Sequence, residues 1–192
     1  MFDSICAHVR NCNRDCLEPV IELAVEIARE GREGRRIGTL FTFGDAEAVI
    51  ERSRTLILDP LAGHPAEVKH ITNPNLRGTI KELAQLDGGF IVSDDGVVIS
   101  ACRYLDAEAS DIALPLGLGS RHLAGASISR VTNAIGVVVS ESAMVRIFDD
   151  GRLIAEIIPE LWLMSSHRRN VQMRGAYKEE HEGDMAVLIE EP

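Results

Sequence analysis

Aromatic residues are scarce in this chain of 192 residues, where Phe, Trp and Tyr together make up 4%. The core must therefore be built from aliphatic side chains, in a chain that is 45% hydrophobic and 26% charged, a composition typical of soluble globular domains. Basic residues are also in deficit: 20 Lys and Arg stand against 30 Asp and Glu, for a formal net charge of -10. This excess of negative charge argues against nucleic acid or an anionic membrane as a partner, because both need a basic surface.

Long hydrophobic runs are absent, so no segment is expected to span a membrane, and residues 1–10 lack the apolar stretch of a secretory signal. We therefore expect a cytoplasmic protein whose four cysteines are reduced. Three of them, Cys6, Cys12 and Cys16, cluster with His8, but their C-x5-C-x3-C spacing matches no common zinc pattern. Both a metal site and ordinary helix thiols remain open as interpretations of this cluster.

The chain divides into three segments by composition and periodicity. Residues 1–35 are predicted to form an N-terminal helical segment, in which residues 19–30 carry apolar side chains at helical spacing. Residues 36–165 alternate short apolar runs with helical patterns and are expected to hold the core. Residues 166–192 are polar with charges of both signs, which predicts a tail, or an arm that packs only in a larger assembly.

The order of the predicted elements indicates an α/β fold with a mixed central β-sheet flanked by helices. Asp94 and Asp95 separate two apolar runs, and residues 149–151 separate two more, as the turns of β-hairpins do. The predicted helices after residue 35 are 46–53, 76–86 and 120–133, with a short helix or turn at 160–164. The predicted strands are 36–43, 56–58, 89–93, 96–105, 135–140, 144–148 and 152–158.

Asp95 and Gly96 are the first candidates for chemistry. Asp-Gly is a strong signal for a tight hairpin, which is the structural interpretation. A carboxylate at the mouth of an apolar strand is also a candidate metal ligand or base.

A run of polar residues, Gly119 to His122, opens a predicted helix. It combines free backbone N–H groups, a hydroxyl, a guanidinium and an imidazole, all of which suit a phosphate. The alternative is an N-cap serine followed by two solvated basic residues. Ser140 and Glu141 end the next strand, and polar groups at a strand end beside a helix N-terminus are a common ligand site in α/β sheets.

These motifs together resemble the diadenylate cyclase (DAC) domain, the catalytic domain of DNA-integrity scanning proteins and of related bacterial and archaeal cyclases. The resemblance covers residues 38–158, and residues 40–49 and 87–107 are most similar to archaeal members. The family's first signature, an Asp-Gly-Ala turn, is matched by Asp95, Gly96 and Val97. Val97 departs from the signature's alanine where the turn packs beneath the nucleotide.

The family's second signature is Arg-His-Arg preceded by Gly-Thr, and residues 119–123 match it. Leu123 replaces the second arginine, which removes a cation expected to contact the triphosphate. Residues 131–142 match the strand that follows in the family and its Ser-Glu exit.

The resemblance implies an enzyme that condenses two ATP molecules into cyclic di-AMP and releases two pyrophosphates, with Mg²⁺ or Mn²⁺ as cofactor. The product is two-fold symmetric, so the resemblance also implies a homodimer whose sites face each other, alone or within a larger homo-oligomer. Two alternatives remain open: an ATP-binding sensor that has lost turnover through Leu123, and a metal-binding scaffold.

The resemblance also implies a role for each site residue. Asp95, Arg121 and His122 would be catalytic, and Asp95 and Glu141 would hold the metal. Leu114 would lie where the main chain meets adenine. The residues expected to bind the nucleotide are Gly96, Val97, Leu114, Gly119, Ser120, Arg121, His122, Leu123 and Ser140.

Overall fold

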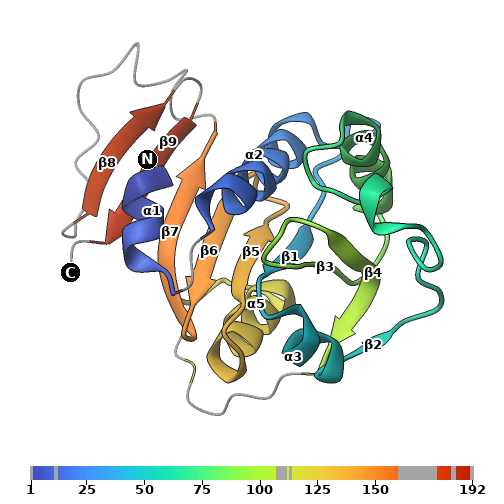
Figure 1. The fold of residues 1–192 in the computed structure, drawn as a ribbon. Helices are drawn as coiled ribbons and strands as arrows, with labels where there is room; N and C mark the ends of the chain where they lie inside the picture. Colours follow the sequence, from blue (N-terminus) through green and yellow to red (C-terminus); the bar gives the residue numbers. More distant parts are fainter. Residues whose placement is uncertain are drawn as a thin grey trace.

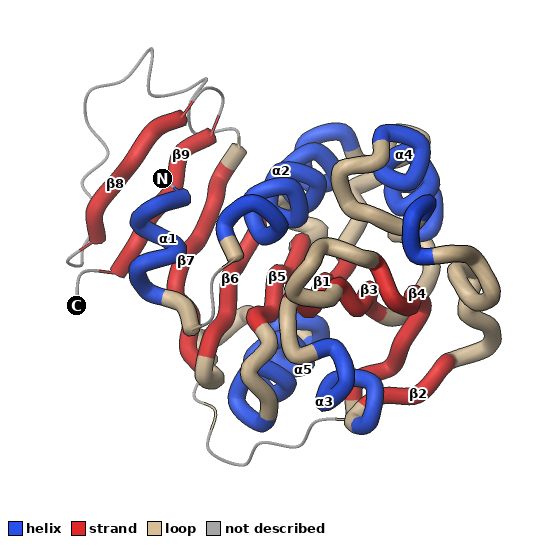
Figure 2. Tube along the Cα trace, in the orientation of Figure 1, coloured by secondary structure: helices blue, strands red, loops and turns tan. Residues whose placement is uncertain are grey.

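The structure is a computed structural model, which describes residues 2–10, 13–106, 112, 114–159, 177–182 and 185–190. It is a mixed β-sheet with helices on both faces (Figures 1 and 2), as the sequence predicted. Strand order in the sheet is β2-β4-β3-β1-β5-β6-β7-β9-β8. β1 and β3 are parallel, and every other neighbouring pair is antiparallel. The strands are β1 (Thr39–Phe43), β2 (Ser53–Thr55), β3 (Gly89–Val92), β4 (Val98–Leu105), β5 (Ile135–Val139), β6 (Val145–Asp149), β7 (Arg152–Ile158), β8 (Tyr177–Glu182) and β9 (Met185–Glu190).

The helices form two layers around this sheet. α2 and α4 cover one face, while α3 and α5 cover the other, and α1 lies beside β7 (Figure 1). None of the helices in the described part of the chain combines the length and hydrophobicity that crossing a bilayer requires. Their bounds are α1 (Phe2–His8), α2 (Arg14–Glu30), α3 (Ala46–Glu51), α4 (Pro74–Leu83) and α5 (Ser120–Val131), with a short 3-10 turn, η1 (Ala66–Val68).

Alternation along the central strands supplies both cores, because successive side chains of a strand point to opposite faces. In β1, Phe41 and Phe43 join the cluster under α2 and α4, whereas Leu40 joins the cluster under α5. Phe41 and Phe90 stack with ring centroids 5.0 Å apart. Since β1 and β5 are buried along their whole length, they read as continuous apolar runs rather than alternating ones.

Close packing of α5 on β5 fixes the position of that helix on the sheet. A Cβ on Gly136 would lie 2.6 Å from the carbonyl oxygen of Gly125, and a Cβ on Gly125 would lie 2.7 Å from Val138 Cγ2. Only glycines allow this approach. The first turn of α5 is thereby held beside the strand ends where β1 and β3 begin and β5 finishes.

Three parts of the fold differ from the sequence predictions. Residues 56–58 were predicted to be a strand, but they lie outside the sheet and Ile57 is 94% exposed. The strand is instead β2, and the Arg103 guanidinium ties it to β4 through hydrogen bonds to Ser53 and to Thr55 Oγ1. α2 starts at Arg14, earlier than predicted, and its buried face belongs to the same core as the sheet.

Beyond residue 159, β8 and β9 add two antiparallel strands next to β7, in a segment that the sequence analysis assigned to a polar tail. The short helix or turn predicted at 160–164 lies outside the described residues.

Candidate functional site

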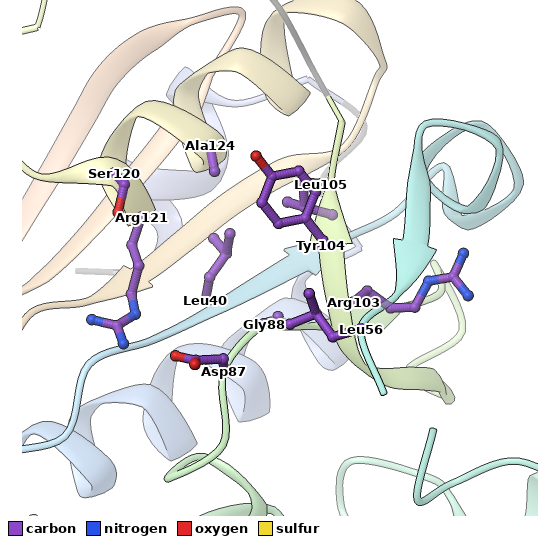
Figure 3. Close-up of a pocket in the computed structure, with 11 residues that line it drawn as sticks. Leu40, Leu56, Asp87, Gly88, Arg103, Tyr104, Leu105, Ser120, Arg121 and Ala124 are labelled. Carbon is purple, nitrogen blue, oxygen red and sulfur yellow. The ribbon is translucent and has the colours of Figure 1, made fainter. Parts of the chain in front are cut away.

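A cavity of about 440 Å³ opens at the end of the sheet where strands β1 and β3 begin, next to the start of α5 (Figure 3). Its size is that of a small-molecule site. Apolar and polar groups converge in it, which is the usual composition of such sites. The lining residues are Leu40, Leu56, Asp87, Gly88, Gly89, Arg103, Tyr104, Leu105, Ser120, Arg121 and Ala124.

Asp87 brings a carboxylate to this cavity from the loop just before β3. Figure 3 shows its carboxylate on the side of the cavity where Arg121 lies. Gly88, which follows it, has φ +99, and a Cβ there would lie 2.6 Å from the backbone carbon of Cys102. Only glycine fits this conformation and this contact, so Gly88 sets the turn that presents Asp87.

The first turns of α5 form the opposite wall. Ser120, Arg121 and Ala124 line the cavity, because positions i, i+1 and i+4 share one side of a helix. Gly119 is the N-cap and has no side chain to cap the helix. The Gly119 carbonyl accepts hydrogen bonds from the backbone N–H groups of His122 and Leu123. The N–H groups of Ser120 and Arg121 are left to an anion, which the helix dipole also favours there.

Arg121 and Glu141 meet beside the cavity. Arg121 Nη1 donates a hydrogen bond to Glu141 Oε1 over 3.0 Å. Gly38, at the start of β1, makes room for this pair: an added Cβ would lie 2.6 Å from Arg121 Nη1 and 3.2 Å from Glu141 Cγ. Glu141 thus serves here as the counter-ion of Arg121. Ser140 does not line the cavity, and its hydroxyl lies 2.8 Å from that of Ser142.

Tyr104 and Arg103 lie on β4 at the far wall and play different parts. The Tyr104 ring is half-exposed, with Arg54 Cζ 4.6 Å from its centroid. The Arg103 guanidinium is directed away from the cavity, to its partners on β2 (Figure 3). Among the residues that line this cavity, Tyr104 is the only one with an aromatic side chain.

The predicted Asp95–Gly96–Val97 turn is not brought to this cavity. It follows the C-terminal end of β3, so the four residues of the strand, roughly 13 Å, separate it from the Asp87 end. The carbonyl of Asp95 accepts a hydrogen bond from His70 Nε2 (2.9 Å), and a hydrogen bond from the Ser93 hydroxyl lowers the pKa of the Asp95 carboxyl. Gly96, with φ +80, turns the hairpin. These contacts fit the hairpin interpretation of the motif.

His122 faces the core rather than the cavity. It is 7% exposed, its Nε2 accepts a hydrogen bond from Arg146 Nη1 (3.1 Å), and its ring packs edge-on against Phe148. Burial, and then the charge of Arg146, lower the pKa of His122 to about 4. With this pKa the imidazole is neutral near pH 7 and carries no positive charge. It also lies on the side of α5 opposite Ser120, away from the cavity.

Leu123 and Leu114 also lie outside the cavity lining. Leu123 is 48% exposed on α5, and so is neither buried in the core nor part of the cavity wall. Leu114 is half-buried and packs against the cluster under α5, which contains the cavity residues Leu40 and Leu105 and against which Ala124 also packs. Of the predicted nucleotide-binding residues, the structure brings Ser120 and Arg121 to the cavity.

Asp87 and Tyr104 were missed by sequence reasoning. Gly88 and Gly89 directly follow the helix predicted at residues 76–86, where glycine commonly ends a helix. Yet Asp87-Gly88-Gly89 also fits an Asp-Gly-small pattern, and its third residue is closer in size to alanine than Val97 is. One Asp-Gly pair precedes β3 and the other follows it, so the family's Asp-Gly-Ala signature can be matched at either end of this strand.

Within the described ranges, no group of three His, Cys, Asp or Glu side chains is placed to hold a metal ion by itself. Cys16 is a buried free thiol, as is Cys102. The expectation of four reduced cysteines is wrong for Cys6, which is disulfide-bonded. Cys12 lies outside the described residues.

The comparisons with known proteins agree with the family suggested by the motifs. The model of the DAC family, described as the DisA bacterial checkpoint controller nucleotide-binding domain, matches residues 26–153. The chain belongs to the DAC family. A diadenylate cyclase from Methanocaldococcus jannaschii is 51% identical over 144 residues, which cover 74% of this chain and 45% of that protein. A diadenylate cyclase from Haloferax volcanii is 42% identical over 149 residues, covering 76% of this chain and 54% of that one.

This DAC chain spans about half the length of the curated relatives it matches. Among solved structures, a double cysteine mutant of DacA from Staphylococcus aureus has the same fold, with a TM-score of 0.51 and 24% sequence identity. The match covers 72% of this chain and 84% of DacA.

Proposed function

We propose that the chain is a diadenylate cyclase, which joins two ATP molecules into cyclic di-AMP and releases two pyrophosphates. The observation that carries the proposal is the convergence of Asp87 with Ser120 and Arg121 on one cavity in a member of the DAC family. It unites an acid, a helix N-terminus and a guanidinium, which are the groups that phosphoryl chemistry at an α-phosphate needs.

ATP is proposed to lie with its base on the β4 side and its phosphates on the α5 side. Tyr104 offers an aromatic face for adenine, with Leu40 and Leu105 forming apolar walls around it. Ser120, Arg121 and the first N–H groups of α5 face the phosphates. This arrangement lets an acidic protein bind an anion, because the positive groups are concentrated at one end of one cavity.

Asp87 replaces Asp95 as the proposed catalytic carboxylate. In the reaction, the 3′-oxygen of one ATP attacks the α-phosphorus of the other, and the hydroxyl proton passes to a carboxylate. The bond between the α-phosphorus and the bridging oxygen breaks, and its electrons leave with pyrophosphate. Asp87 is the only carboxylate among the residues that line the cavity, so it is placed to accept that proton.

A divalent cation fits this donor set. Mg²⁺ typically takes one or two carboxylates together with substrate phosphates, and Asp87 supplies one such oxygen ligand. When bound, Mg²⁺ or Mn²⁺ would offset phosphate charge and lower the pKa of the attacking hydroxyl. Neither of the other two candidate carboxylates lines the cavity: Glu141 is paired with Arg121, and Asp95 lies at the other end of β3.

Two copies of the chain are required, since each cavity holds one ATP and each nucleotide attacks the other. We therefore propose a homodimer with its cavities face to face, on its own or within a larger homo-oligomer.

Product analysis tests this function. The protein is incubated with ATP and Mn²⁺ or Mg²⁺, and nucleotides are separated and identified by mass. Cyclic di-AMP is the expected product; its absence, with ATP bound but unchanged, would favour an ATP sensor of the same fold. The sensor has one observation in its favour: Leu123 is not part of the cavity wall and supplies no charge to replace the family's second arginine.

A further inference from the structure

A second groove, of about 230 Å³, lies next to the cavity on the far side of Arg121. Arg121 lines both spaces. The charged residues that line the groove are Arg32, Glu33, Arg35, Arg36, Arg121 and Glu141. Four arginines against two glutamates give this groove a net positive charge, in a chain whose formal net charge is -10.

The arginines of the groove differ in what they already bind. Arg32 forms an ion pair with Glu82. Arg36 donates a hydrogen bond from Nη1 to the carbonyl of Ala28 (3.0 Å). The Arg35 side chain is exposed and has no hydrogen bond or ion pair with any residue that the structure describes. Its five donors are therefore free for a ligand.

Arg121 connects the two spaces because Gly38 leaves room for it. Its side chain is 39% exposed and that of Glu141 is 69% exposed. An ion pair this exposed is weak and exchanges readily. An anion that enters the groove can therefore take the place of Glu141 on Arg121.

We propose that this groove binds a diphosphate: the β- and γ-phosphates of the nucleotide in the adjoining cavity, and then the pyrophosphate that leaves. Arg35 and Arg121 are its donors. This proposal rests on the proposed function of the cavity. Arg35 thereby supplies, from the loop before β1, the cation that α5 lacks at Leu123.

Arg35→Ala is the direct test, with Arg152→Ala as a matched control. Arg152 is an exposed arginine at the start of β7, in the β6–β7 hairpin, at the opposite end of the strands from the cavity. Binding of ATP, AMP and inorganic pyrophosphate to the full chain is measured by calorimetry for the wild type and both variants. One lost charge-assisted contact corresponds to about a ten-fold change in affinity.

We expect Arg35→Ala to weaken ATP and pyrophosphate by about that factor and to leave AMP unchanged, because AMP has no phosphate that reaches the groove. Arg152→Ala should change none of the three. Equal ATP and pyrophosphate affinities in Arg35→Ala and wild type would overturn the proposal, as would a parallel loss of AMP binding. If the wild type binds neither ATP nor AMP, the proposed function of the cavity fails. The pyrophosphate measurement then still decides whether the groove binds a diphosphate.

Discussion

Gly38 and Arg121 are in contact so close that a Cβ on Gly38 would lie 2.6 Å from Arg121 Nη1. Gly38→Ala should therefore push the guanidinium away from Glu141 and out of the position between the cavity and the groove. We expect ATP affinity to fall by about ten-fold, because one charge-assisted contact is lost. The melting temperature should barely move, since the displaced atom is the end of a flexible side chain.

Gly78→Ala is the control for this substitution, because a Cβ on Gly78, in α4, meets nothing within 4 Å. ATP titrations and thermal melts of both variants check the prediction. Unchanged ATP affinity in Gly38→Ala would mean that the position of Arg121 does not matter for binding.

The burial of His122 predicts a pH dependence of stability. Its folded-state pKa of about 4 lies below the ordinary 6.5, so the unfolded chain takes up a proton at this site more readily than the native one. The stability that His122 contributes is therefore complete above pH 6.5 and is lost as the pH falls from 6.5 toward 4. Between about pH 7.5 and about pH 5 the loss amounts to about 2 kcal/mol.

His122→Gln isolates this contribution, because the amide oxygen can still accept a hydrogen bond from Arg146 but does not titrate. Urea unfolding at both pH values should show a smaller loss of stability in the variant, by about 2 kcal/mol. An equal loss in variant and wild type would show that His122 is not buried as a neutral imidazole.

Leu123→Arg should be tolerated by the fold. Leu123 is 48% exposed, so the substitution buries no charge, and surface changes of this kind usually stay within about 0.5 kcal/mol. A thermal melt of the purified variant checks this. A marked drop in melting temperature would mean that the Leu123 side chain is packed in an interface or in the core.

The proposed face-to-face homodimer predicts how the rate depends on protein concentration. At saturating ATP, cyclic di-AMP formation per subunit should fall on dilution once the dimer dissociates. Light scattering on the same dilution series gives the oligomeric state. Full activity in a sample that is monomeric by mass would contradict a reaction between two sites.

Much of the fold could be predicted because its signals are local. The hairpin at residues 149–151 and the strand that follows it, β7, were predicted correctly from a turn motif between two apolar runs. The run at residues 56–58 was misassigned because hydrophobicity alone does not place a segment in a sheet. Residues 53–55 pair with β4 instead, where they accept hydrogen bonds from Arg103, which lies about 50 residues later in the sequence.

The lining of the candidate cavity was only half predictable for the same reason. Ser120 and Arg121, which line it, were among the predicted residues because a polar run that opens a helix is a local pattern. The choice between Asp87 and Asp95 depends on which end of β3 lies beside α5. That is decided by the parallel pairing of β1 with β3 and by the packing of α5 on β5, and no short stretch of sequence encodes either.

The most direct test of the account compares Asp87→Asn with Asp95→Asn in cyclic di-AMP formation from ATP. Both substitutions remove one carboxylate charge and preserve side-chain shape, and thermal melts establish that each variant is folded. We predict that Asp87→Asn lowers the rate by at least about a hundred-fold, as the loss of a general base does, and that Asp95→Asn stays within about two-fold of wild type. A rate that collapses in Asp95→Asn and survives in Asp87→Asn would contradict the assignment of the catalytic carboxylate to the start of β3.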